Sequence, residues 1–222
     1  MIRISDLRFA YRGGFELSVP SLDIARGEKL ALVGPSGSGK TTLVYLMTGI
    51  LRPAAGKISI GGDTLTGRTD RELRNLRISK VGFIFQEFEL LDYLNVRENI
   101  LLPYLMNRSL NLDAEARGRA DTLASEVGLG DKLSRRPGEL SHGERQRVAI
   151  CRALITRPSV IVADEPTGNL DRVTADSILD IIMRQVKLHD ATLVTVTHDQ
   201  TLLDRFDRVV DLRDYTEVAV RQ

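Results

Sequence analysis

A glycine-rich segment near residue 40 contains the residue types that hold a chain of phosphate groups. It reads Gly34-Pro35-Ser36-Gly37-Ser38-Gly39-Lys40-Thr41 and matches the pattern GxxxxGK[ST]. Glycines let successive backbone N–H groups turn towards an anion, and the lysine places a positive charge on the β- and γ-phosphates. The threonine hydroxyl is a ligand for Mg²⁺. We therefore predict a nucleoside triphosphate site at residues 34–41, with Thr42 beside it.

The sequence on either side of this loop supports the prediction. Residues 29–33 form a short apolar run that is typical of a strand, and the loop is followed by Leu43, Leu46, Met47 and Ile50 at the spacing of a buried helical stripe. A helix that begins at the loop directs the positive end of its dipole at the phosphates. The alternative, a flexible surface turn, would not need this context.

Two adjacent acids end a second apolar strand. Residues 160–163 are Val-Ile-Val-Ala, and Asp164 and Glu165 follow them directly. A carboxylate at the end of a buried strand is costly unless it meets a cation or hydrogen-bond donors. We therefore predict that Asp164 belongs to the Mg²⁺ shell and that Glu165 polarises the attacking water. Acids in this position also cap helices, and it is the pairing with the glycine-rich loop that favours catalysis.

Three further segments have residues that suit a nucleotide site. Ser141 and Gly143 open a helix that runs to about Ile155, so a hydroxyl and open backbone N–H groups point at an anion there. His198 ends the strand predicted at residues 192–197; alone it would be an ordinary surface histidine. Tyr11 precedes a glycine pair, and its alternatives are stacking on a base and packing on the core.

The elements that position these residues alternate between strands and helices. Antiparallel strands are predicted at residues 2–9 and 15–24, and further strands at 29–33, 57–60, 81–85, 160–163, 192–197, 208–212 and 217–220. The run 81–85 is almost wholly apolar, so we expect it to be central. Helix signals dominate residues 98–154, with a second helix through 178–186. This order predicts an α/β fold with a mixed, mainly parallel sheet and ligands at the carboxyl ends of its strands.

We expect the 222 residues to form one domain. Its core would comprise residues 1–86 and 156–222, including an antiparallel β flank, and residues 87–155 would form an inserted helical lobe. Net charge is +1, which argues against binding nucleic acid through uncompensated Lys and Arg. The single cysteine, Cys151, excludes an intrachain disulfide and is expected to be an inert helix residue. No run approaches the roughly 18 apolar residues that span a bilayer. A cytoplasmic protein is expected, with any membrane work done by a partner.

Taken together, these segments resemble the nucleotide-binding subunit of an ABC transporter, and the resemblance covers essentially the whole chain. Ser141 and Gly143 match the family sequence LSGGQ, which contacts the γ-phosphate of ATP held by the opposite subunit. Tyr11 matches the aromatic that stacks on adenine, and Gln86 matches the glutamine that senses Mg²⁺ and the membrane partner. Asn169-Leu170-Asp171 match the D-loop, and His198 matches the histidine that contacts the γ-phosphate.

The resemblance implies a P-loop NTPase (RecA-like) core and an ATPase that uses ATP and Mg²⁺. It implies Mg²⁺ ligands at Thr41, Gln86 and Asp164, a nucleotide contact at Asp171, and catalytic roles for Lys40, Gln86, Glu165 and His198. It also implies a dimer with a second nucleotide-binding subunit, expected to be identical. An integral membrane permease subunit would contact residues 88–103 at the inner face of the membrane.

Two strings, residues 164–171 (DEPTGNLD) and 98–103 (ENILLP), are most similar to one branch of the family. That branch includes the lipoprotein-release, macrolide-export, antimicrobial-peptide-resistance and cell-division ATPases of bacteria. The resemblance implies coupling of ATP to export, lipoprotein release or mechanotransmission. The alternative is an ATP-dependent regulatory or scaffold partner of the cell-division type. A soluble ABC ATPase that acts on DNA or ribosomes is disfavoured by the balanced charge.

The family sequence LSGGQ is altered at two positions, where His142 and Glu144 replace glycine and glutamine. An acid near a triphosphate is unfavourable if it points inward. We therefore expect Glu144 to face away from the nucleotide or to pair with a nearby arginine. For His142 there are two hypotheses: it lies close to the phosphate and makes activity fall as pH rises, or it only caps or packs.

Overall fold

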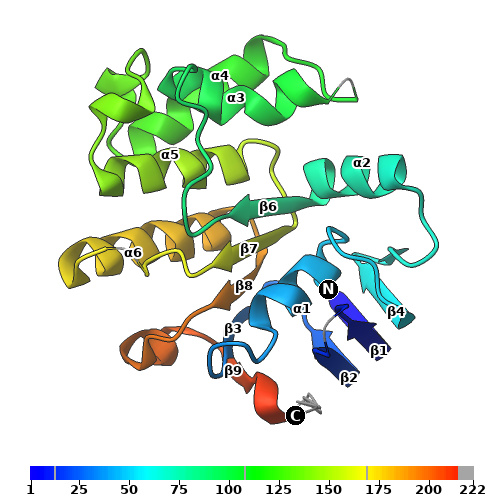
Figure 1. Ribbon diagram of the computed structural model, residues 1–222. Coiled ribbons are helices and arrows are strands. Elements are labelled where there is room, and N and C mark those ends of the chain that lie inside the picture. The colour runs from blue at the N-terminus through cyan, green and yellow to red at the C-terminus, as the bar shows by residue number, and fades with distance from the viewer. Residues whose placement is uncertain (13, 108, 169, 215–222) are drawn as a thin grey trace.

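The computed structural model of the chain describes residues 1–12, 14–107, 109–168 and 170–214. Within these ranges the chain forms two β-sheets with helices between and around them (Figure 1). No helix in the described ranges is both long enough and apolar enough to cross a bilayer.

The larger sheet is parallel and has five strands. They are β3 (Lys29–Val33), β6 (Val81–Ile84), β7 (Val160–Asp164), β8 (Thr192–Val196) and β9 (Arg208–Asp211). Their order across the sheet is β6-β7-β8-β3-β9, and every neighbouring pair is parallel. All five carboxyl ends therefore meet at one edge of the sheet, which is where open α/β sheets bind ligands.

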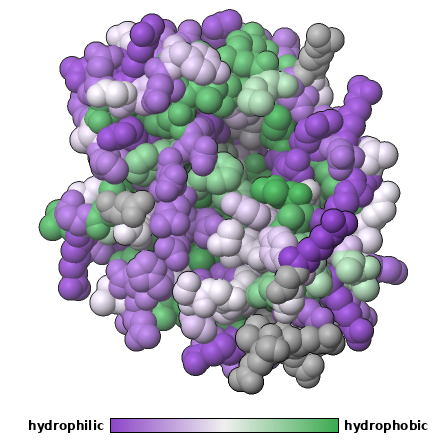
Figure 2. Space-filling view, viewed as in Figure 1, coloured by the Kyte–Doolittle hydropathy of each residue, from purple (hydrophilic) through white to green (hydrophobic). Residues whose placement is uncertain are grey.

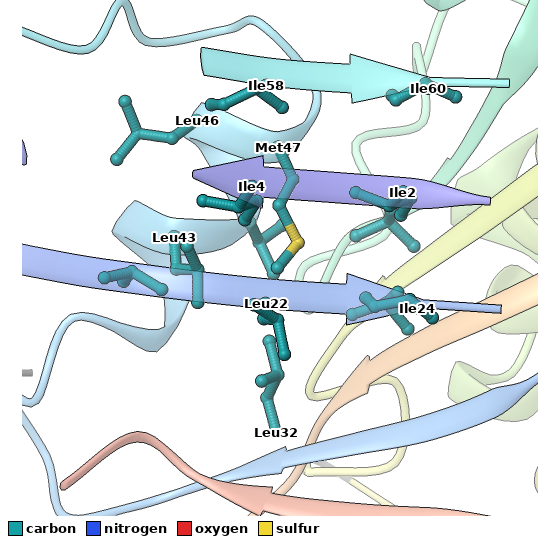
Figure 3. Packing of buried hydrophobic residues seen from close by; sticks show 14 of the residues in the cluster. Ile2, Ile4, Leu22, Ile24, Leu32, Leu43, Leu46, Met47, Ile58 and Ile60 are labelled. Carbon is teal, nitrogen blue, oxygen red and sulfur yellow. The ribbon is translucent and has the colours of Figure 1, made fainter. Parts of the chain in front are cut away.

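The smaller sheet is antiparallel and forms a flank. It contains β1 (Ile2–Ala10), β2 (Glu16–Ile24), β4 (Ala55–Ile60) and β5 (Asp63–Thr64), in the order β2-β1-β4-β5. Between the two sheets lies α1 (Lys40–Met47), whose apolar side chains meet alternate residues of β1, β2 and β4 (Figure 3). This buried contact anchors the helix that begins at the glycine-rich loop.

The second core lies on the other face of the parallel sheet. It includes α3 (Val96–Met106), α4 (Ala114–Glu126), α5 (His142–Leu154) and α6 (Arg172–Leu188). In Figure 1, α3, α4 and α5 gather at one end of the molecule. Strand β7 contributes to both cores, because Val160 and Val162 face α1 while Ile161 and Ala163 face α5 and α6. This explains why its run is continuously apolar.

Several sequence predictions need correction. The strand at 81–85 is not central: β6 is an edge strand and ends at Ile84. It is apolar because α5 covers it. Ile50 does not continue the buried stripe, since α1 ends at Met47 and Ile50 is 42% exposed. The sequence reading missed α2 (Asp70–Lys80) and β5. The strand predicted at residues 217–220 lies outside the described residues.

Gly82 of β6 offers a test of the contact with α5. A Cβ atom at this position would lie 2.2 Å from the Ala153 carbonyl oxygen, so Gly82→Ala should lower the free energy of unfolding by about 1–3 kcal/mol. Gly118 in α4 is the matched control, because a Cβ there meets nothing within 4 Å. Gly118→Ala should raise stability by about 0.5–1 kcal/mol. Urea unfolding of both variants measures the difference, and equal effects would contradict this packing.

Candidate active site

The glycine-rich loop ends where α1 begins. Gly39, the residue before the helix, has a left-handed backbone (φ 95°) and provides no side-chain cap. A Cβ atom on Gly39 would lie 2.8 Å from Cζ of Phe15, so only glycine fits at this position. The N–H groups in the first turn of α1 therefore remain open to an anion, as at other phosphate-binding helix ends.

The Lys40 ammonium lies inside this loop. Its Nζ donates to the carbonyl oxygens of Gly34 at 2.8 Å and Pro35 at 3.0 Å, and the residue is buried. A lysine ammonium has three donors, of which two hold the loop closed around the charge. Lys40 thus shapes the loop and places a positive charge where phosphates would bind.

A cavity of about 500 Å³ lies against the loop. This volume is within the range of nucleotide-sized ligand sites. Its lining comes from the β1–β2 turn, the glycine-rich loop and the ends of β7 and β8: Tyr11, Phe15, Gly34, Ser36, Gly37, Gly39, Lys40, Thr41, Thr42, Glu165 and His198. The structure therefore brings together most of the predicted loop residues with Tyr11, Glu165 and His198.

An aromatic cluster forms one wall of the cavity. Tyr11 is 46% exposed, and its ring lies edge-on to Phe9 at 4.8 Å and tilted to Phe15 at 5.9 Å. An exposed ring held by two others is a platform on which a base can stack. Sequence reasoning missed Phe15 as a site residue. The signal was present, because aromatics stand on both sides of the glycine pair.

Asp164 lies beside the phosphate loop, at the end of β7. The Thr41 hydroxyl donates to Asp164 Oδ1 at 3.4 Å. Burial raises the pKa of Asp164, and the charge of Glu165 adds to this effect, while the Thr41 hydrogen bond and Lys40 oppose it. A cation at this position would favour the ionised form.

The residues around Asp164 fit Mg²⁺. Within the described ranges, no three His, Cys, Asp or Glu side chains form a metal cluster. A metal here would have to take most of its ligands from a hydroxyl, phosphate oxygens and water. Mg²⁺ binds in this way, through one or two carboxylates and substrate phosphates.

Glu165 is held in an unusual backbone conformation. Its φ is 46°, a left-handed value that costs a non-glycine residue about 1–3 kcal/mol. The Glu165 N–H donates to Val196 O at 3.0 Å, and its Oε2 lies 3.4 Å from Nδ1 of His198. The ends of β7 and β8 thus fix both side chains at the same side of the cavity.

The start of α5 is capped by its own residues. Ser141 is the N-cap, and it forms a reciprocal pair of hydrogen bonds with Glu144. The Glu144 carboxylate also pairs with Lys132, which lowers the pKa of Glu144 to about 2. The predicted arginine partner is therefore wrong, because the cation that pairs with Glu144 is a lysine. The His142 ring packs edge-on against Phe88, at 5.5 Å between centroids, as the packing hypothesis expects.

The remaining predicted residues lie away from the cavity lining. Ser141 is the N-cap of α5 and Gly143 lies in its first turn, while Gln86 is exposed two residues beyond the end of β6. Asp171 caps α6 by accepting hydrogen bonds from the backbone N–H and hydroxyl of Thr174. Asn169 lies outside the described residues. Cys151 is fully buried in α5, as predicted for a small apolar helix residue, and burial raises the pKa of its thiol.

Comparison with known proteins agrees with this geometry. The family model described as "ABC transporter" matches residues 17–168, which is more than half of the chain. The chain belongs to the ABC transporter family. It is an ATP-binding, ATP-hydrolysing subunit of that family.

Individual relatives include members of the branch that the sequence resembles. The lipoprotein-releasing system ATP-binding protein LolD of Hydrogenovibrio crunogenus is 39% identical and is covered over 94% of its length, with 96% of this chain aligned. The uncharacterized ABC transporter ATP-binding protein YbbA of Escherichia coli K12 is 44% identical, with 89% of its length and 90% of this chain aligned. The macrolide export ATP-binding/permease protein MacB of Syntrophobacter fumaroxidans is 39% identical, but only 30% of its length aligns with 96% of this chain.

Solved structures confirm the fold class of this ABC ATPase. A dimeric post-hydrolysis state of the ATP-binding cassette MJ0796, bound to ADP and Pi, aligns with a TM-score of 0.85 at 31% identity. That alignment covers 100% of both chains. A second dimeric structure of MJ0796 gives a TM-score of 0.84 at 32% identity, with 95% of this chain and 94% of MJ0796 aligned.

The Glu144–Lys132 ion pair predicts a pH-dependent stability. Glu144 has a lower pKa in the folded state than in the unfolded chain, so its contribution is present above about pH 4.5 and is lost as pH falls towards 2. Glu144→Gln keeps a side chain that can complete the capping box but loses the ion pair. The variant should be about 1 kcal/mol less stable than wild type at pH 7, and the gap should narrow between pH 5 and pH 3. Urea unfolding at pH 7, 5 and 3 measures it. A gap independent of pH would contradict the assignment.

Proposed function

We propose that the chain binds MgATP in the cavity beside α1 and hydrolyses it there. The phosphates lie in residues 34–42, the adenine stacks on Tyr11, and Lys40 neutralises the β- and γ-phosphates. Thr41 and Asp164 hold the Mg²⁺, with Gln86 joining them when the site closes. One observation carries the proposal: Lys40, Thr41 and the Glu165–His198 pair line one nucleotide-sized cavity, and the Thr41 hydroxyl contacts Asp164 directly behind it.

The chemistry follows from where the charges lie. Thr41 and Asp164 would hold Mg²⁺, which would supply positive charge against the phosphates and Asp164 when bound. Glu165 accepts hydrogen bonds from the attacking water and orients it in line with the γ-phosphate. His198, 3.4 Å from Glu165 and exposed at the cavity, donates to the γ-phosphate or orients Glu165. The open N–H groups of α1 hold the triphosphate in place throughout.

A second copy of the chain completes the site in this proposal. Ser141 and Gly143 are absent from the described lining of the cavity, although α5 presents a helix N-terminus that suits an anion. We propose that they contact the γ-phosphate of ATP held by the opposite subunit, with Asp171 near the same boundary. The dimeric MJ0796 structures support this arrangement, because they align with this chain over nearly its whole length.

A membrane subunit is the proposed partner, with residues 88–103 as its docking segment on the cytoplasmic side. Tyr93 in this segment is 71% exposed, and Leu105 and Met106 at the end of α3 are 54% and 73% exposed. Hydrophobic side chains gather over the helical lobe and beneath it on the face shown in Figure 2. Exposed apolar groups of this kind are typical of protein interfaces. LolD is named for lipoprotein release, and MacB is named as a macrolide export ATP-binding/permease protein. Both names support a membrane partner that takes part in export or lipoprotein release.

The proposed roles separate binding from hydrolysis. Lys40→Ala should lower ATP turnover at least about 100-fold, because an essential charge on the phosphates is lost. Glu165→Gln should lower turnover by about 10²–10⁴-fold and leave ATP affinity near wild type. Phosphate release and fluorescent-nucleotide titration measure the two quantities. Lys187→Ala, an exposed lysine on α6, is the control and should behave as wild type. Normal turnover in Glu165→Gln would contradict its role.

The proposed dimer should accumulate when hydrolysis is blocked. Glu165→Gln with ATP and Mg²⁺ is expected to elute as a dimer and to be monomeric with ADP, because only the γ-phosphate joins both subunits. Adding Ser141→Arg to that variant should restore the monomer, since the bulky side chain occupies the contact. Size-exclusion chromatography with light scattering provides the measurement. A monomeric Glu165→Gln protein in saturating MgATP would count against the dimer.

A further inference from the structure

One buried side chain joins α5 to the segment that contains Glu165. Gln146 lies one turn into α5 and is fully buried. Its Nε2 donates to the carbonyl oxygen of Pro166 at 2.7 Å. Since a carbonyl only accepts hydrogen bonds, the amide must present its NH₂ group to Pro166, which fixes the orientation of the side chain.

The Pro166 carbonyl is an effective place to hold this segment. Proline has no N–H group, so the carbonyl is the only backbone group of Pro166 itself that can form a hydrogen bond. The strained Glu165 is already fixed towards β8, where its N–H donates to Val196 O at 3.0 Å. On the side of Pro166, its carbonyl accepts from Gly168 N at 3.1 Å, and the Gln146 hydrogen bond joins this turn to α5. A left-handed glutamate persists only where its surroundings determine it on both sides.

Stability alone gives little reason for a glutamine at position 146. Its Oε1 is buried without a partner among the described residues, and an unpaired buried acceptor is destabilising. An apolar side chain of the same length would fill the space without that penalty. What the apolar side chain would lose is the hydrogen bond to Pro166.

A second buried side chain keeps α5 in place independently of Gln146. Arg152, near the other end of the helix, donates to the carbonyl oxygens of Phe88 and Glu89, in the segment that follows Gln86. Phe88 and Glu89 also have left-handed backbone conformations. Removal of the Gln146 donor should therefore leave α5 docked and should affect mainly the Glu165 segment.

We propose that Gln146 is a positioning residue, which fixes Glu165 through the Pro166 carbonyl and so ties the carboxylate to the helix that presents Ser141. The inference rests on the proposed function. In the proposed dimer, Ser141 serves the nucleotide of the opposite subunit while Glu165 serves its own. One hydrogen bond inside each chain thus connects the two ATP sites, and movement of α5 at one site changes the position of Glu165 at the other.

Gln146→Met tests this role because methionine keeps the length and loses the donor. Turnover, counted per ATP-binding site by stoichiometric titration, should fall about 10- to 100-fold, as expected when a reacting group is displaced by about 1 Å. ATP affinity should stay within about twofold of wild type, since the cavity lining does not include Gln146. The ATP-bound dimer should live longer than that of wild type, a change that a loss of folded protein would not produce.

Gln185→Met is the matched control. Gln185 is also fully buried, also has an unpartnered Oε1, and donates to Glu126 in a contact between α6 and α4. Gln185→Met should have a lower free energy of unfolding than wild type and should keep wild-type turnover per site. Should Gln146→Met fail to fold, Gln146→Leu lacks the donor as well and serves in its place. If the Gln146 variant has the same turnover and the same dimer lifetime as Gln185→Met, the inference is overturned. A wild-type protein without ATPase activity would instead overturn the proposed function beneath it.

Discussion

Negative charge at the carboxyl edge of the parallel sheet is the constraint on which the site depends. Asp164 and Glu165 are adjacent there, and burial together with the charge of Glu165 already raises the pKa of Asp164. A triphosphate adds further negative charge at the same place. This negative charge is stabilised by Lys40, the open N–H groups of α1 and the Thr41 hydroxyl. Contacts within the chain itself hold Lys40 and Thr41 in place, and such preorganised groups stabilise charge effectively.

The backbone around Glu165 shows how the fold supports this charge. Its left-handed conformation is held by β8 through Val196 and by α5 through the Gln146–Pro166 hydrogen bond. The same helix begins at Ser141, whose hydroxyl and capping partner Glu144 form its N-terminus. One element, α5, therefore contacts the segment of the carboxylate and also carries the helix tip. This arrangement fits an enzyme whose site is completed by another copy of itself.

Sequence reasoning succeeded where the determining interactions are local. The glycine-rich loop, the apolar strand before Asp164 and the start of a helix at Ser141 each depend on a few neighbouring residues, so a short pattern reveals them. It placed β6 wrongly in the centre of the sheet, because an apolar run reports burial and not which elements cause it. It missed α2, although Thr69 and Glu72 form a capping box, since few of its residues are apolar and only Leu73 and Leu76 are buried. Lys132 and the Gln146–Pro166 contact depend on chain segments brought together by folding, and no local pattern shows them.

The central claim is that a triphosphate is bound between the glycine-rich loop of one subunit and the Ser141 end of α5 in another. Mixing two inactive proteins tests it most directly. Lys40→Ala disables the loop and Ser141→Arg disables the helix tip, so each protein alone has two defective sites. A mixed dimer has one site with both defects and one site with neither. The account predicts that mixing the two proteins restores MgATP hydrolysis that neither shows alone. Mixtures that stay inactive, although the subunits exchange, would contradict it.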